Sequence, residues 1–231
     1  MNSPVPAASA RLYFFVHRLF IFMAWFVFKQ TLTGLENVPK EGPFLVVCNH
    51  ISFFDIPLVF MMQSRRQMVM FCADKWREAP LIGAFCEMMG VIWVSRGEAD
   101  MDAIKLSLGH LKAGGILAVA PEGTRNHTGP LQAGKTGAAY LADRTGVPIL
   151  PLAIWGQEDT VRNLKRLGRT SVTGVLGKPF CLPVGGRAKS EKLQEYTDFI
   201  MCQLAALMPP EYRGVYADHP KLRELLVNHS A

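Results

Sequence analysis

The chain has 231 residues, of which 49% are hydrophobic and 19% are charged, and its formal net charge is +6. This length suits one enzymatic domain with its own core and is too short for two, and the hydrophobic content excludes a disordered chain. The positive charge is compatible with nucleic acid, anionic lipid or a phosphorylated substrate. The basic residues are scattered and accompany no nucleic-acid motif, so we expect no nucleic-acid partner.

The five cysteines form no CxxC pair, and the six histidines are dispersed along the chain. Cysteines that stand in apolar runs are typical of buried thiols in a reducing compartment. We therefore expect neither a disulfide framework nor a metal site.

An apolar, aromatic-rich run covers residues 12–28 and is interrupted by His17 and Arg18. It is shorter than the roughly 20 apolar residues that cross a bilayer, and no small-residue cleavage site of a signal peptide follows it. Three interpretations remain open: a helix that lies in the membrane interface or dips into it, a short spanning helix, or an aromatic helix packed on the protein's own core. We predict a membrane-associated anchor at residues 1–30 and one further domain at residues 31–231.

After a connector at residues 31–42, apolar segments alternate with segments of helical periodicity. Strands are predicted at residues 44–48, 68–72, 91–94, 116–120, 149–155 and 170–176. Helices are predicted at residues 56–62, 81–89, 101–111, 135–144 and 191–207. This alternation indicates an α/β fold, with a mostly parallel sheet flanked by helices.

In such sheets, functional loops follow the carboxyl ends of strands. One of these loops holds His50 and Asp55, a pair in which the carboxylate could fix the tautomer of a histidine that takes a proton from a hydroxyl. Five residues turn an α-helix by roughly 500°, which leaves the two side chains about 140° apart. Part of residues 50–55 must therefore be a turn if the side chains meet. The alternative is that Asp55 only caps the helix that follows.

A second loop, after the strand at residues 116–120, reads PEGTR and places Glu122 and Arg125 beside Gly123. The guanidinium fork of arginine suits phosphate oxygens, so this loop is a candidate phosphate site. A surface turn with an ion pair is the alternative.

Together, the loops resemble the 1-acylglycerol-3-phosphate acyltransferase family within the glycerolipid acyltransferases. Asn49 and His50 with Asp55 are similar to its NHxxxxD motif, and residues 121–125 are similar to its PEGTR block. Segments within residues 75–97 and 147–151 resemble the second and fourth blocks of the family. The resemblance covers roughly residues 34–180, and its departures at Phe54 and Ala120 remove no chemical group.

The resemblance implies that His50 is a general base, oriented by Asp55, for the attack of a hydroxyl on an acyl thioester. It implies that the acceptor phosphate is held by Glu122, Gly123, Thr124 and Arg125, with Lys75 and Arg96 as further contacts. The implied activity is that of a 1-acyl-sn-glycerol-3-phosphate O-acyltransferase, which makes residues 31–231 the acyltransferase domain. Acyl-CoA or acyl-carrier protein would be the co-substrate and membrane lipids the partners, without a cofactor. The implied location is the cytoplasmic face of the inner (plasma) membrane.

Other functions remain open. The acceptor could be another lysophospholipid, an aminolipid or glycerol 3-phosphate, or the chain could be a non-catalytic lipid-binding protein on the same fold. Residues 129–136 also fit the P-loop pattern GxxxxGK[ST]. A polar stretch separates them from the preceding predicted strand, and no apolar run ending in a magnesium-binding aspartate follows, which disfavours a nucleotide hydrolase. Lys135 of this segment instead faces the same phosphate pocket or caps a surface.

Overall fold

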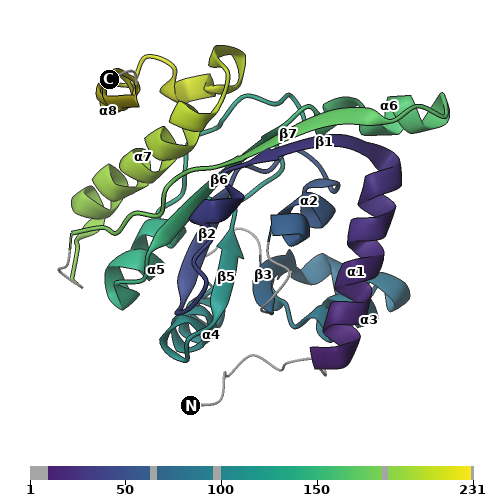
Figure 1. The fold of residues 1–231 in the computed structure, drawn as a ribbon. Helices are drawn as coiled ribbons and strands as arrows, with labels where there is room; N and C mark the ends of the chain where they lie inside the picture. Colours follow the sequence, from purple (N-terminus) through teal and green to yellow (C-terminus); the bar gives the residue numbers. More distant parts are fainter. Residues whose placement is uncertain (1–9, 63–66, 96–99, 184–186, 230–231) are drawn as a thin grey trace.

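The computed structural model describes residues 10–62, 67–95, 100–183 and 187–229 (Figure 1). A seven-stranded sheet runs through the molecule in the order β1-β7-β6-β2-β5-β3-β4. The strands are β1 (Phe28–Thr33), β2 (Phe44–Cys48), β3 (Met68–Ala73), β4 (Ile92–Val94), β5 (Ile116–Val119), β6 (Ile149–Trp155) and β7 (Thr170–Leu176). All neighbouring strands are parallel except β6 and β7. The prediction of a mostly parallel sheet is confirmed.

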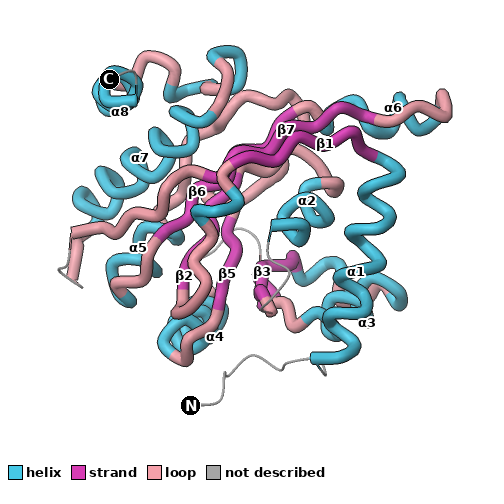
Figure 2. Tube along the Cα trace, in the orientation of Figure 1, coloured by secondary structure: helices cyan, strands magenta, loops and turns pink. Residues whose placement is uncertain are grey.

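Helices cover both faces of this sheet (Figure 2). They are α1 (Ala10–Val27), α2 (Asp55–Met62), α3 (Pro80–Met89), α4 (Met101–Lys112), α5 (Gly137–Thr145), α6 (Thr160–Lys165), α7 (Ser190–Leu207) and α8 (Pro220–His229). The central strand β2 is buried along its whole length. Its side chains alternate between two hydrophobic cores. Leu45 and Val47 pack with α4, α5 and α7, whereas Phe44, Val46 and Cys48 pack with α1 and α2.

One predicted segment is wrong. The supposed connector at residues 31–42 begins inside β1, which pairs in parallel with β7 at the edge of the sheet. Only alternate residues of β1 are buried or half-buried, and its exposed positions are polar, so it lacks the continuous apolar pattern of a central strand. The proposed boundary after residue 30 falls within this strand.

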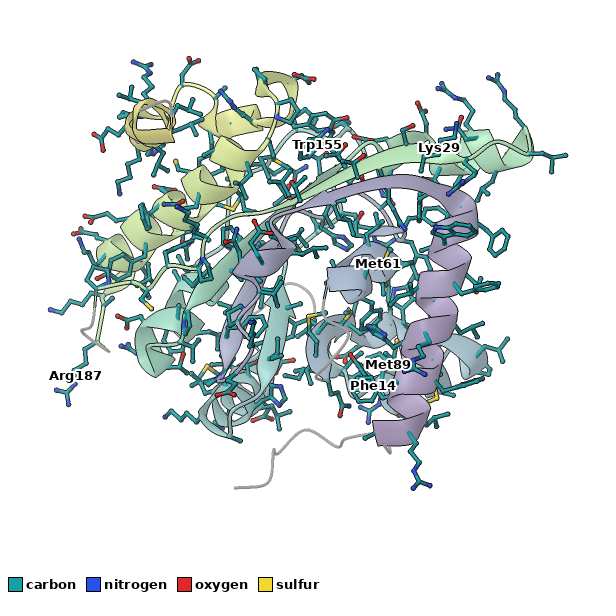
Figure 3. The ribbon with its side chains drawn as sticks, in the orientation of Figure 1. Phe14, Lys29, Met61, Met89, Trp155 and Arg187 are labelled. Atoms are coloured by element: carbon teal, nitrogen blue, oxygen red, sulfur yellow. The ribbon has the colours of Figure 1, made fainter. Side chains whose placement is uncertain are left out.

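Helix α1 has two different faces. Its inner face packs against α2, and there the buried His17 places Nε2 2.7 Å from the backbone carbonyl oxygen of Phe60. Its outer face exposes large apolar side chains, among them Phe15 at 65% and Phe22 at 59% exposure. On the side of α1 that faces away from the sheet, side chains project outward from the molecule (Figure 3). Among the described residues, α1 is the one helix whose length and composition would let it cross a membrane.

Candidate active site

The loop between β2 and α2 brings His50 and Asp55 together. Nδ1 of His50 lies 2.7 Å from Oδ2 of Asp55. Between them the chain turns, with the amide of Asp55 donating to the carbonyl of Ser52. The sequence expectation that this segment turns is confirmed. Since an ionised Asp55 only accepts hydrogen bonds, Nδ1 carries the proton, and Nε2 of the neutral ring is left as an acceptor.

Asp55 is almost completely buried, at 3% exposure, and four donors surround its carboxylate. Oδ2 accepts the amides of Ile51 and Ser52 at 2.8 and 3.1 Å in addition to the imidazole. Oδ1 accepts Nε2 of Gln157 at 2.8 Å. These bonds run back into the loop and across to the segment after β6 rather than forward into α2, so the carboxylate does more than cap that helix. The sequence did not predict a role for Gln157, because no motif indicates that it contacts Asp55, which lies 102 positions earlier in the chain.

Asn49 fixes the start of the same loop. Its side-chain amide donates to the carbonyl of Ile154 at 2.7 Å, and its Oδ1 accepts the amide of Ile154 at 2.8 Å. Asn49 is thereby bound to β6 as a strand residue would be, just where β2 ends. These two hydrogen bonds set the position of the neighbouring His50.

Glu122 joins the PEGTR loop to the histidine loop. Its Oε1 accepts the amide of His50 at 3.1 Å, and its Oε2 accepts the amide of Gln132 at 3.0 Å. The amide of Asn126 donates to the carbonyl of His50 at 2.7 Å. Burial raises the pKa of the Glu122 carboxyl above its ordinary value. This carboxylate is directed at two backbone amides and does not line the cavity, so the structure places it differently from the expected phosphate contact.

A cavity of about 400 Å³ opens beside His50. The PEGTR loop contributes Gly123 and Thr124 to its lining, and Lys135 lies next to them. Gly123 has φ of 67°, and a Cβ atom there would lie 2.9 Å from Cδ of Lys135. Glycine therefore allows both the turn and the close approach of the lysine. Of the two alternatives considered for Lys135, the structure has the one in which it lies at the same cavity as the PEGTR loop, and its side chain is also exposed.

Most of the cavity is apolar. Its wall includes Ile56 and Val59 of α2, Met70 of β3, Ile104 of α4 and Leu141 of α5. A largely apolar cavity whose wall includes a few polar groups suits a ligand with a long hydrocarbon part and a polar head.

Cys48 also lines this cavity and could be considered as a nucleophile. Burial raises the pKa of its thiol. Because the thiolate is the reactive form, a thiol that stays protonated at neutral pH does not attack a thioester. The site therefore suits general-base catalysis by His50 rather than the formation of an acyl-cysteine at Cys48.

Three predicted phosphate contacts lie apart from the cavity wall or outside the described residues. Arg125 is half-buried and does not line the cavity. Lys75 is exposed after β3, with Nζ 5.2 Å from the ring centroid of Trp76. Arg96 lies outside the described residues. In the part of the chain that the structure describes, no group of three or more His, Cys, Asp or Glu side chains is placed to bind a metal ion.

The P-loop pattern at residues 129–136 lies in the long loop between β5 and α5. The strand that a P-loop requires directly before it is absent at this described position. The alternative of a nucleotide hydrolase therefore loses its structural basis.

The chain belongs to the acyltransferase family, whose model matches residues 29–155 and so includes both the His50–Asp55 pair and the PEGTR loop. It is 32% identical over 133 residues to a 1-acyl-sn-glycerol-3-phosphate acyltransferase of Borreliella burgdorferi, which covers 55% of this chain and 51% of that protein. It is 34% identical over 133 residues to the chloroplastic 1-acyl-sn-glycerol-3-phosphate acyltransferase LPAT1 of Arabidopsis thaliana, covering 56% and 36%. The chain thus spans about half the length of these relatives or less.

A solved structure is also similar. The crystal structure of the 1-acyl-sn-glycerophosphate (LPA) acyltransferase PlsC from Thermotoga maritima matches with a TM-score of 0.62 and 26% sequence identity. The match covers 80% of this chain and 76% of that chain. It supports the α/β fold over the four fifths of the chain that the match covers.

Proposed function

We propose that the protein transfers an acyl group from a thioester to the free hydroxyl of 1-acyl-sn-glycerol 3-phosphate and so forms phosphatidate. The observation that carries this proposal is the imidazole of His50, held by Asp55 at 2.7 Å, in the wall of a largely apolar cavity. The printed names of the relatives support the same activity.

In the proposed mechanism, Nε2 of His50 accepts the proton of the acceptor hydroxyl while the hydroxyl oxygen attacks the thioester carbonyl. Asp55 stabilises the imidazolium that forms. When the tetrahedral intermediate collapses, the carbon–sulfur bond breaks, and the leaving thiolate takes the proton from Nε2. The histidine is regenerated, and no acyl-enzyme is needed. A non-catalytic lipid-binding protein would have no use for a histidine oriented in this way by a buried carboxylate.

The acceptor phosphate is proposed to lie at the mouth of the cavity, against the backbone of Gly123 and Thr124 and the ammonium group of Lys135. Arg125 completes the positive charge on the side of β3, and Lys75 and Arg96 remain proposed contacts beyond it. Glu122 acts as a positioning residue, because a carboxylate would repel the phosphate. The apolar wall of the cavity would hold an acyl chain.

The protein is proposed to act on a membrane surface, at the cytoplasmic face of the inner (plasma) membrane. The inner face of α1 is occupied by α2, and His17 is bonded there, so α1 would have to separate from the domain to cross a bilayer alone. Its outer apolar face can instead lie among acyl chains in the interface. This orientation would let lipid substrates reach the site from the bilayer.

The test uses the purified full chain in detergent micelles with labelled 1-acyl-sn-glycerol 3-phosphate. One series receives acyl-CoA and the other acyl-carrier protein, which determines the donor. We expect labelled phosphatidate, and slower acylation of lysophospholipids whose phosphate is a diester, because a diester offers fewer anionic oxygens to Arg125 and Lys135.

Arg125→Gln should raise the KM for the phosphate acceptor by roughly tenfold, since hydrogen bonds to charged groups are worth about 1.5–3 kcal/mol. Arg223→Gln, on the distant helix α8, is the matched control and should not change KM. Acylation of diester acceptors in preference to the phosphate monoester would contradict the proposed acceptor. No acyl transfer with any acceptor would contradict the proposed function.

A further inference from the structure

A short projection follows β6 and lies outside the part of the chain that the family model matches. We name residues 160–169 the arm; it consists of α6 and the turn that leads into β7. The arm extends beyond the end of the sheet, beside the C-terminal end of α1 (Figure 1). Nothing in the proposed chemistry uses these residues.

The arm carries exposed apolar side chains at its tip. Val161 is 55% exposed, Leu164 is 40% exposed, and Leu167 is 98% exposed. Leu167 also has φ of 55°, in the left-handed region that favours glycine. A partner that covers this side chain would account for a leucine at a position where water favours a smaller or polar residue.

The turn around Leu167 is a regular helix ending rather than an irregular loop. The amide of Gly168 donates to the carbonyl of Asn163 at 2.8 Å, and the amide of Leu167 donates to that of Leu164 at 3.0 Å. This is the Schellman pattern, in which the left-handed position is usually glycine. Leucine is less favourable there than glycine, because its Cβ atom crowds the backbone in the left-handed conformation. The turn itself would form with glycine, so the leucine side chain needs another explanation.

Cations flank this apolar tip. Lys165 and Arg166 directly precede Leu167, and both are exposed. Arg162 is paired with Asp159 at 2.7 Å, whereas no acidic group among the described residues lies within ion-pair distance of Lys165 or Arg166. An apolar tip with adjacent unpaired cations is complementary to a membrane leaflet that contains anionic lipid.

Arg169 binds the arm to α1. Its Nη2 donates to the backbone carbonyl of Trp25 at 2.5 Å and to that of Phe28, and its guanidinium carbon lies 5.7 Å from the ring centroid of Trp25. The carbonyl of Trp25 belongs to the last turn of α1, where carbonyls have no partner within the helix. The tip is thereby fixed close to the helix whose outer face is exposed and apolar.

A hollow of about 370 Å³ lies over the edge strands β1 and β7, next to Trp25 of α1 and Arg169 of the arm. Two cations, Lys29 and Arg169, line it together with the hydroxyl-bearing residues Thr31, Ser171 and Thr173. Among the described residues that line it, none is acidic. Its chemistry suits the phosphate of a lipid headgroup.

We propose that the arm is a second membrane contact, in which Leu167 enters the acyl-chain boundary while Lys165, Arg166 and the hollow bind anionic headgroups. The proposal shares the membrane location of the proposed function but concerns different residues. A protein partner is disfavoured, because the apolar tip is small, flanked by cations and adjacent to the apolar face of α1. With both contacts on the membrane, the orientation of the domain about α1 would be fixed.

The test measures the partition of the full chain onto phosphatidylcholine vesicles, and onto the same vesicles containing phosphatidylglycerol. Leu167→Gly should weaken binding to both by roughly tenfold, the loss expected for one buried leucine side chain. Its free energy of unfolding should be unchanged or higher, because glycine relieves the left-handed conformation. Val227→Ala on α8, also an exposed apolar residue, is the matched control and should bind as the wild type does.

Lys165→Gln combined with Arg166→Gln should weaken binding to the anionic vesicles by about fivefold for each cation, and this difference should disappear at high salt. Lys105→Gln combined with Lys112→Gln on α4 is the matched control. Wild-type binding by both arm variants would overturn the proposal, as would an equal loss in the controls. Acyl transfer in micelles is measured separately, so failure of the arm proposal and failure of the proposed function can be told apart.

Discussion

Asp55 has contacts well beyond the motif that predicted it. Its Oδ1 accepts the amide of Gln157, whose own Oε1 is buried without a hydrogen-bond partner among the described residues. A buried acceptor without a partner costs about 1–3 kcal/mol. The side-chain N–H group of Gln157 is therefore the group that has a function. It fixes the orientation of the Asp55 carboxylate, and the carboxylate in turn fixes the imidazole of His50. Gln157 is a positioning residue.

Gln157→Glu would place a second carboxyl group at the 2.8 Å contact with Asp55. Two carboxyl groups at this short distance share one proton, because two negative charges there would repel each other. Asp55, which is required as an anion, would therefore lose its proton only at higher pH. We expect the acid limb of the kcat–pH profile to move upward, and kcat at neutral pH to fall by roughly tenfold with little change in KM.

Gln157→Leu removes the donor without adding a charge, so it should lower kcat while the acid limb stays in place. Gln157→Asn retains an amide and should be the mildest of the three changes. The positioning role would be refuted by a Gln157→Glu profile that coincides with that of the wild type.

Sequence reasoning succeeded for residues whose chemistry and neighbours lie in one loop, such as His50 and Asp55. It misplaced Glu122, because the letters of the PEGTR block do not reveal that this side chain is directed at the amides of His50 and Gln132. Gln157 could not be found, since its partner is determined by the position of β6 beside β2.

At the scale of elements, α1 and α2 each end with a carbonyl that is satisfied from elsewhere in the fold. His17 of α1 bonds the carbonyl of Phe60 in the last turn of α2, and Arg169 of the arm bonds that of Trp25 in the last turn of α1. Carbonyls in the last turn of a helix have no intrahelical partner. These two bonds fix α1 to the domain on one side and to the arm on the other.

His17→Leu should loosen α1, because the buried carbonyl of Phe60 would lose its donor at a cost of about 1–3 kcal/mol. Hydrogen exchange of the α1 amides should become faster, while the amides of β2 and β5 keep their protection. Phe15→Leu, on the exposed face of the same helix, is the matched control and should leave exchange unchanged. Equal protection of α1 in His17→Leu and the wild type would show that this bond does not hold the helix.

The elements that sequence predicted best are the buried ones. The buried apolar strands β2 and β6 were predicted at their observed bounds, and so was β7, in which alternate positions are buried. Edge strand β1 was missed because four of its six residues are polar, and the short helices α6 and α8 were not predicted. The antiparallel pairing of β6 with β7 has no signal within either strand, since it depends on how the chain returns through the arm.

For the whole molecule, the order of strands explains why two loops far apart in sequence form one site. β2 lies between β5 and β6, so the histidine loop meets the PEGTR loop on one side and Gln157 on the other. The strand ends supply the base and its orienting groups, and the helices above them supply the apolar wall of the cavity. Sequence predicted that parallel strand ends would carry the site, whereas the order of the strands required the structure.

The most direct test of the proposed mechanism is the rate of phosphatidate formation by the purified full chain and by His50→Ala. A general base contributes about 10²–10⁴-fold, so we predict a loss of that size in kcat for His50→Ala. The circular dichroism spectrum should be unchanged. His219→Ala, which alters a histidine before α8 and outside the cavity wall, is the control and should keep the wild-type rate. A folded His50→Ala variant that forms phosphatidate at the wild-type rate would contradict the account.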